Sequence, residues 1–143
     1  MQNANDIKIS VLNFTEYPGP RYIIQGADSG EDFYHKVLNK AFYEAYTKNV
    51  NLVLDLDNTA GYPPSFLDEA VGNLVYDFTL TEVKKRLVII SEQEPDWKEM
   101  IEGEVYSNWQ ERIMKKQLPV KTVTPKESWY RLVDGQVKLD KWI

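Results

Sequence analysis

Two short apolar runs constrain the fold of this chain more strongly than any other feature. They are "NLVLDL" at residues 51–56 and "RLVIIS" at residues 86–91. Each run is apolar enough for a strand that is buried on both faces, and such strands are typical of the interior of a sheet covered by helices. Segments with helical periodicity precede, separate and follow them. We therefore expect a buried sheet with helices packed on it.

Three segments show the spacing of amphipathic helices. The first opens at Ser29, which can cap the amides of the next turn, and the second opens at Ser65 as the expected N-cap. The third runs from Pro95 to about Lys116, with an apolar residue at every fourth position. Gly72 lies inside the second helix, where it costs about 1 kcal/mol relative to alanine. Close approach of a neighbouring element would explain that glycine.

The two ends of the chain predict shorter β elements. Residues 7–14 and 21–25 are expected to pair as a hairpin around the turn residues "YPGP". Near the carboxyl end, "LPVKTVTP" is expected to add an edge strand, and Asp134 with Gly135 favours the tight turn of a second hairpin.

These features divide the chain into a domain at 1–120 and an extension at 121–143, a strand and hairpin packed on the domain. Two tryptophans, Trp129 and Trp142, can pack either on the domain or on another protomer. In one hypothesis the protein is an oligomeric scaffold whose hairpin, with Tyr130 and Trp142, exchanges between protomers.

Composition excludes several classes of protein. Hydrophobic residues make up 43% and charged residues 27% of the chain, as in an ordinary compact globule. The net charge of −5 argues against nucleic-acid binding, which needs a basic face. No apolar run has the length of a signal peptide or a membrane span, and no cysteine is present, so we expect a cytoplasmic protein. The single histidine, His35, is expected on a helix surface and not as a metal ligand.

One motif raises the possibility of catalysis. The sequence "DLDNT" matches the DxDxT signature of haloacid-dehalogenase-type phosphotransferases. In such an enzyme Asp55 would attack as the nucleophile, Asp57 would protonate the leaving group, and a magnesium ion would neutralise the clustered charge. Ser91 would supply the phosphate-binding hydroxyl of the second motif.

The remaining parts of that site are missing from the sequence. No lysine stands before an acidic metal-binding pair on a later strand, and the nearest acids, Asp134 and Asp140, fall in the expected hairpin. Asp55 and Asp57 are therefore expected to end a central strand and shape the loop after it. A magnesium-dependent phosphatase built on this pair is the alternative function.

A second set of motifs carries a more specific resemblance. The motifs are, in order, "YPGPRY", "SGEDF", "LVLDLDN" and "GYPPSFLDEAVGNLV", and the second buried strand follows them. These motifs resemble the STAS-like family of unknown function, a relative of the bacterial anti-sigma-factor antagonists. The similar region extends from about Pro18 to about Lys116. The resemblance implies an α/β fold, in which about three helices flank a small mixed sheet and the C-terminal β-hairpin is an extension.

The resemblance also implies a function without catalysis or a cofactor. In bacterial partner switching, a STAS domain docks on a kinase-like ATPase regulator, and phosphorylation of a serine at the start of one helix breaks the complex. A phosphate adds about −1.5 to −2 charge in the middle of such an interface. A signalling module that binds a protein partner is therefore the leading hypothesis, and self-association is compatible with it.

The expected switch surface comprises the loop from residue 57 and the start of the second helix. When Gly72 and Leu74 are laid on the "SSGLGxL" pattern of the antagonists, Asp68 and Glu69 fall where those proteins carry a serine pair. Acidic residues there either mimic a phosphorylated state or favour the positive end of the helix. Ser65 is the candidate acceptor, unless it only caps the helix. The expected partner-binding or switch residues are Asp57, Asn58, Ser65, Asp68 and Glu69.

Overall fold

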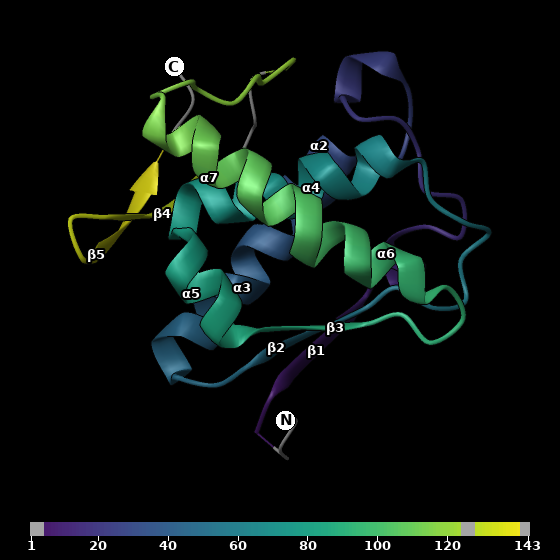
Figure 1. Ribbon diagram of the computed structural model, residues 1–143, viewed down its shortest axis with the longest axis horizontal. Coiled ribbons are helices and arrows are strands. Elements are labelled where there is room, and N and C mark those ends of the chain that lie inside the picture. Colours follow the sequence, from purple (N-terminus) through teal and green to yellow (C-terminus); the bar gives the residue numbers. More distant parts are fainter. Residues whose placement is uncertain (1–4, 124–127, 141–143) are drawn as a thin grey trace.

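A three-stranded parallel sheet and a helical layer make up most of the structure (Figure 1), a computed structural model that describes residues 5–123 and 128–140. The sheet has the order β1-β2-β3, and a separate antiparallel hairpin pairs β4 with β5. The α/β class and the C-terminal hairpin are thus confirmed. The strands are β1 (Ile7–Ser10), β2 (Leu52–Asp55), β3 (Leu87–Ile90), β4 (Trp129–Val133) and β5 (Gln136–Asp140).

The helices fall into three groups along the chain. Before β2 they are α1 (Val11–Phe14), a 3₁₀ turn at Ile23–Gln25, α2 (Gly30–Phe33), a π-helical stretch at Tyr34–Leu38 and α3 (Asn39–Lys48). Between β2 and β3 they are α4 (Pro64–Phe78) and α5 (Leu80–Arg86). After β3, α6 (Pro95–Met100), a π-helical stretch at Ile101–Val105 and α7 (Tyr106–Met114) form one continuous helical segment. The three expected helical segments are therefore present.

One face of the sheet packs on the helices. The register aligns Ile7, Leu52 and Leu87 in one row and Ile9, Leu54 and Ile89 in the next, and all six belong to or pack against the core cluster. β2 is central and its three apolar residues are buried, as the run "NLVLDL" predicts. The parallel arrangement places the carboxyl ends of β2 and β3 at the same edge.

Helix α4 lies at the centre of the helical layer and contacts α2, α5, α7 and β4. Most of its residues are buried, which explains its apolar character on all sides. Gly72 faces the indole of Trp109 on α7, where a Cβ atom would lie 2.1 Å from Cε2. The close approach expected from this glycine is confirmed.

The expected hairpin of residues 7–14 with residues 21–25 is wrong. Strand β1 stops at Ser10, whose hydroxyl accepts a hydrogen bond from the amide of Asn13 and caps α1. Ile23 lies in a 3₁₀ turn because its amide donates to the buried carboxylate of Glu31 (2.9 Å). β1 pairs in parallel with β2, so the sheet in the described residues is parallel and not mixed.

The expected edge strand is not formed in residues 118–123, and the rest of that segment, 124–125, lies outside the described residues. The hairpin after it packs on the domain. Tyr130 stacks on Tyr43 with 3.6 Å between ring centroids, and Asn39 exchanges hydrogen bonds with the Tyr130 backbone. The expected exchange of Trp142 between protomers lies outside the described residues. Among the described residues, no helix has the length and apolarity needed to cross a membrane.

Candidate functional site

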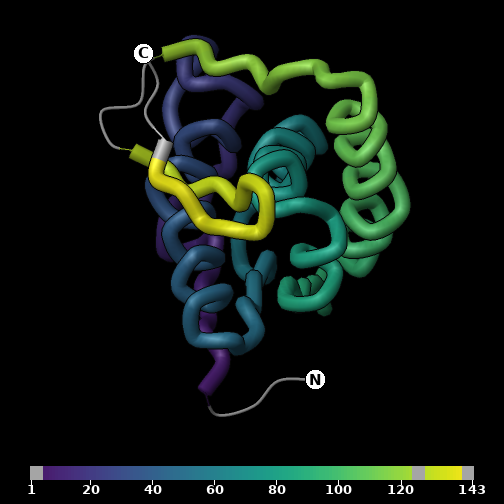
Figure 2. Tube along the Cα trace, turned by 90° about the vertical axis from the view of Figure 1, so that its left-hand side faces the viewer, coloured from purple at the N-terminus to yellow at the C-terminus, as the bar shows by residue number. Residues whose placement is uncertain are grey.

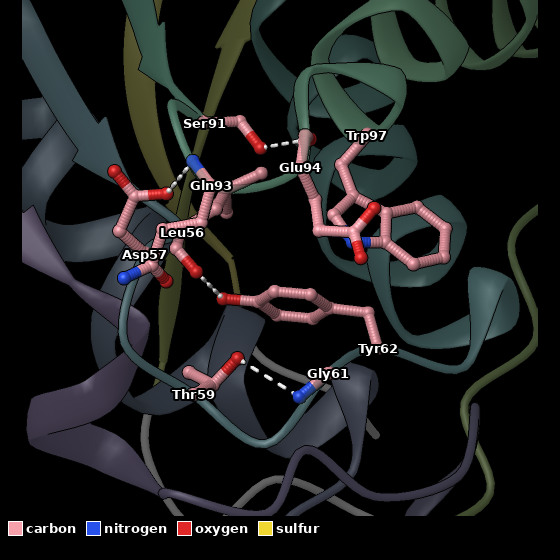
Figure 3. A pocket seen from close by; sticks show the side chains of 9 residues that line it. All are labelled: Leu56, Asp57, Thr59, Gly61, Tyr62, Ser91, Gln93, Glu94 and Trp97. Carbon is pink, nitrogen blue, oxygen red and sulfur yellow. Dashed lines mark hydrogen bonds between the residues drawn. The ribbon is translucent and has the colours of Figure 1, made fainter.

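Two loops meet at the carboxyl edge of the sheet and lead into α4 and α6. Asp55 ends β2 opposite Ile90 of β3, so the loop after Asp55 and the loop after Ile90 lie side by side. Figure 3 shows the residues that line the pocket between them. The sequence motif and the topology agree here, because Asp57 and Ser91 both line this pocket.

The carboxylate of Asp57 joins the two loops. Its oxygens accept hydrogen bonds from the amides of Glu92 (3.2 Å) and Gln93 (3.0 Å), and its own amide donates to Oδ1 of Asp55 (2.9 Å). Hydrogen bonds to an ionised acceptor are about twice as strong as neutral ones. The pair therefore shapes the loop after the strand, as the sequence analysis expected.

Asn58 and Gln93 add a second connection between the loops. The Asn58 amide donates to Gln93 Oε1 (2.7 Å), and Gln93 Nε2 donates to Asn58 Oδ1 (2.9 Å). Asn58 is exposed and has a φ of 73°, a conformation that asparagine tolerates better than most residues. Sequence reasoning missed Gln93, although its place just after a parallel strand was the available signal.

The pocket between the loops is small. Its volume is about 30 Å³, which is room for little more than a water molecule. Tyr62 closes one side with its hydroxyl donating to the Leu56 carbonyl (2.6 Å), and burial raises the pKa of Tyr62 to about 12. Trp97 packs edge-on against Tyr62, so both aromatic residues serve the core and the pocket wall together.

The parts that a phosphatase would use are engaged within the loops. Asp55 and Asp57 accept backbone amides, and the Ser91 hydroxyl donates to the Glu94 carbonyl (2.5 Å). Within residues 5–123 and 128–140, no cluster of three histidine or acidic residues has the geometry of a metal site. The arrangement supports loop structure better than phosphoryl transfer.

The start of α4 differs from the expected one. Pro63 is the N-cap and Pro64 the first helical residue, so Ser65 is the second helical residue and not the cap. The reason is that proline is well suited to the first helical position, since the missing amide hydrogen has no partner there. Ser65 is half-buried, and no hydrogen bond of its hydroxyl occurs among the described residues.

The two acidic residues that replace the antagonists' serine pair are bound internally. Asp68 accepts from Arg21 (2.6 Å) and from the indole of Trp109 (3.1 Å). Glu69 is 1% exposed and contacts Arg21 (3.2 Å) and the Asn73 amide (2.8 Å). Burial raises the pKa of Glu69. The phosphate-mimic hypothesis needs negative charge on the surface, but Arg21 neutralises the carboxylates of Asp68 and Glu69. Glu69 is also too buried to contact a partner in this conformation.

A second polar region lies farther along α4, around Asp77. Glu31 and Asp77 are buried, and Arg131 of β4 contacts Asp77 (2.9 Å). The Tyr34 hydroxyl also donates to Asp77, and burial raises the pKa of both groups. Sequence reasoning did not find this region, because its members come from distant segments.

His35 borders this region, and its expected surface position is wrong. The side chain is 8% exposed and packs edge-on against Tyr34 and Trp129. Burial first, and then the positive charges of Lys121 and Lys40, lower the pKa of His35 to about 3. Within the described residues neither ring nitrogen has a hydrogen-bond partner. The burial comes from Trp129, which sequence spacing around His35 does not reveal.

Comparison with known proteins agrees with the motifs. Residues 29–97 match the model of a family described as STAS-like domain of unknown function (DUF4325). This stretch, from the cap of α2 to α6, is similar to that family, which confirms the expected resemblance over a shorter range than residues 18–116. No match was found among curated proteins or among solved structures.

Proposed function

We propose that the protein is a regulatory module that binds a protein partner through the carboxyl-edge loops and the start of α4. The observation that carries this proposal is the connection of both loops by Asp57, next to which Asn58 is exposed. Ser65 follows as the half-buried second residue of α4. The pocket of about 30 Å³ at that edge is too small to enclose a substrate of ordinary size. A protein surface is the ligand class that such an edge suits best.

The partner is a kinase-like ATPase regulator, and Ser65 is the residue whose phosphorylation controls the complex. The first part rests on the resemblance of the sequence motifs to the anti-sigma-factor antagonists, and the description of the family as STAS-like is consistent with that resemblance. A phosphate on Ser65 would add about −1.5 to −2 charge at the second residue of α4. The positive end of the helix would tolerate that charge within the fold. A partner docked there would meet it directly.

Affinity capture from the native cells, with and without magnesium and ATP, tests this function. We expect the natural chain to retain an ATPase or kinase-like protein, and the intact mass of the bait to report any phosphate. Asn58→Gly is the sharpest surface variant, because glycine keeps the positive φ and removes the side chain that bonds Gln93. Retention of the partner by Asn58→Gly and Ser65→Glu alike would remove this surface from the account.

A further inference from the structure

Residues 117–123, here called the strap, cross the molecule from the end of α7 to α2. Figure 2 shows this light green segment running over the top of the helices toward the purple and blue part of the chain. The strap contains no helix or strand. Lys116, directly before it, is exposed and has a φ of 57°, so the chain turns sharply where the strap begins.

Lys121 inserts its side chain toward α4. Its ammonium donates to Asn73 Oδ1 (2.8 Å) and lies 5.2 Å from the ring centroid of Tyr34 and 5.5 Å from that of Trp129. Both distances are within the range of cation–π attraction. Burial lowers the pKa of Lys121, against the opposing pull of Asp77, Glu69 and Glu31. The surface below the strap therefore binds the Lys121 ammonium near two aromatic rings and three acidic residues.

Thr122 supplies the second anchor. Its amide donates to Glu31 Oε2 (2.9 Å) and its hydroxyl to Glu31 Oε1 (2.6 Å). Glu31 is fully buried, and the Ile23 amide is its further partner. Lys121 and Thr122 thus satisfy groups whose burial without a partner would be costly.

The outer side of the strap is apolar and unburied. Leu118 is 74%, Val120 47% and Val123 39% exposed. Polar contacts therefore attach the strap, and little hydrophobic burial adds to them. Segments with few buried apolar contacts are among the first to open in a native protein.

The neighbouring histidine adds an independent observation. His35 is buried against Tyr34 and Trp129, the two rings that flank the Lys121 ammonium, and both of its nitrogens lack a partner in the described part of the chain. A polar group left unsatisfied beside a bound ammonium is unusual for a purely structural core.

We propose that the surface beneath the strap is a docking site for an extended segment of a partner protein that carries a lysine followed by a hydroxyl residue. The strap occupies this site in cis until such a segment displaces it. A Lys-Thr segment from a partner reproduces the same bonds to Asn73 and Glu31, so the exchange is close to balanced in free energy. The proposal does not depend on the partner surface at the start of α4.

A peptide with the strap sequence, residues 117–123 and blocked at both ends, tests the proposal on the full chain. The tethered strap has a high effective concentration, so the natural chain should bind the peptide weakly. In Lys121→Met the site loses its internal ammonium and keeps a side chain of similar length. We expect this variant to bind the peptide at least about tenfold more tightly than the natural chain. The matched control peptide carries acetyl-lysine, which has no charge, and should bind neither chain.

Displacement of the strap by the peptide is measured with a fluorescent label on the strap. The chain has no cysteine, so Val120→Cys provides one labelling site, and fluorescence anisotropy of that label should fall when the lysine peptide binds. A folded Lys121→Met chain that binds both peptides equally, or neither, would overturn the proposal.

A second variant covers the case in which Lys121→Met does not fold. Thr122→Val removes the hydroxyl bond to Glu31 and keeps the buried charge balance. With this variant, the lysine peptide should increase hydrogen exchange of residues 117–123, and an unchanged exchange rate would count against a displaceable strap.

Discussion

Trp109 of α7 packs directly on Gly72 of α4, and no side chain fits between them. A Cβ atom at Gly72 would lie 2.1 Å from both Cε2 and Nε1 of the indole. The indole also donates to Asp68, one turn earlier on α4, which fixes the ring in this position (3.1 Å). The contact between α4 and α7 therefore depends on the absence of a side chain at Gly72.

We expect Gly72→Ala to lower the free energy of unfolding by about 1 to 3 kcal/mol, because overpacking outweighs the better helix propensity of alanine. Gly103→Ala is the matched control, since no atom lies within 4 Å of a Cβ built there. That variant should gain up to about 1 kcal/mol. Urea denaturation of both variants measures the difference. An equal gain in the two variants would contradict the packing described.

Asp57→Ala should lower stability by about 2 kcal/mol, because two backbone amides lose a charged acceptor. Hydrogen exchange of Glu92 and Gln93 should rise at the same time. Glu99→Ala is a suitable control, because Glu99 is an exposed acidic residue within α6. If Asp57→Ala leaves the exchange of both amides unchanged, Asp57 does not hold the loops together.

The same residues separate the structural account from the phosphatase alternative. Turnover of a generic phosphate ester with magnesium, abolished by Asp55→Asn, would show that the pair is catalytic. We expect no such activity, because the Asp55 and Asp57 carboxylates are both engaged by loop amides.

His35 makes stability depend on pH. Its pKa is about 3 in the folded state and 6.5 in the unfolded chain, so the unfolded state binds the proton more tightly between these values. Stability should therefore fall by about 1.4 kcal/mol for each pH unit below 6.5. Glu69 and Asp77 act in the opposite direction, because burial raises their pKa values.

His35→Phe isolates the contribution of the histidine, since the ring stays and the titration is lost. Relative to this variant, the natural chain should lose about 2 kcal/mol between about pH 7.5 and about pH 5. Denaturant unfolding at the two pH values measures the change. A constant difference between the two proteins would show that His35 is not buried as described.

The sequence predicted the strands and helices whose formation depends on local hydrophobic periodicity. The runs at 51–56 and 86–91 form β2 and β3, and the apolar spacing from Pro95 gives the α6 to α7 segment. The aspartate pair was expected to end a strand, and Asp55 does end β2. In these segments hydrophobic periodicity and burial act together.

The parts that sequence did not predict depend on contacts between distant residues. Ile23 forms a 3₁₀ turn because Glu31 takes its amide, and His35 is buried by Trp129. Residues 118–123 were expected to form an edge strand. In the structure Lys121 binds Asn73 of α4 and Thr122 binds Glu31, and neither residue pairs with a strand. The expected N-cap role of Ser65 is wrong for a local reason, since Pro63 is the N-cap and Pro64 begins the helix two residues earlier than expected.

The central claim is that the start of α4 binds a protein partner, and a dissociation constant tests it most directly. Titration calorimetry would measure the affinity of the captured partner for the natural chain, for Ser65→Glu and for Lys84→Glu. Lys84→Glu is the control, because Lys84 is an exposed residue of α5. Glutamate at the second helical position favours the helix, so Ser65→Glu should fold. We predict at least about tenfold weaker binding for Ser65→Glu and unchanged binding for Lys84→Glu. Equal affinity of all three proteins would contradict the claim.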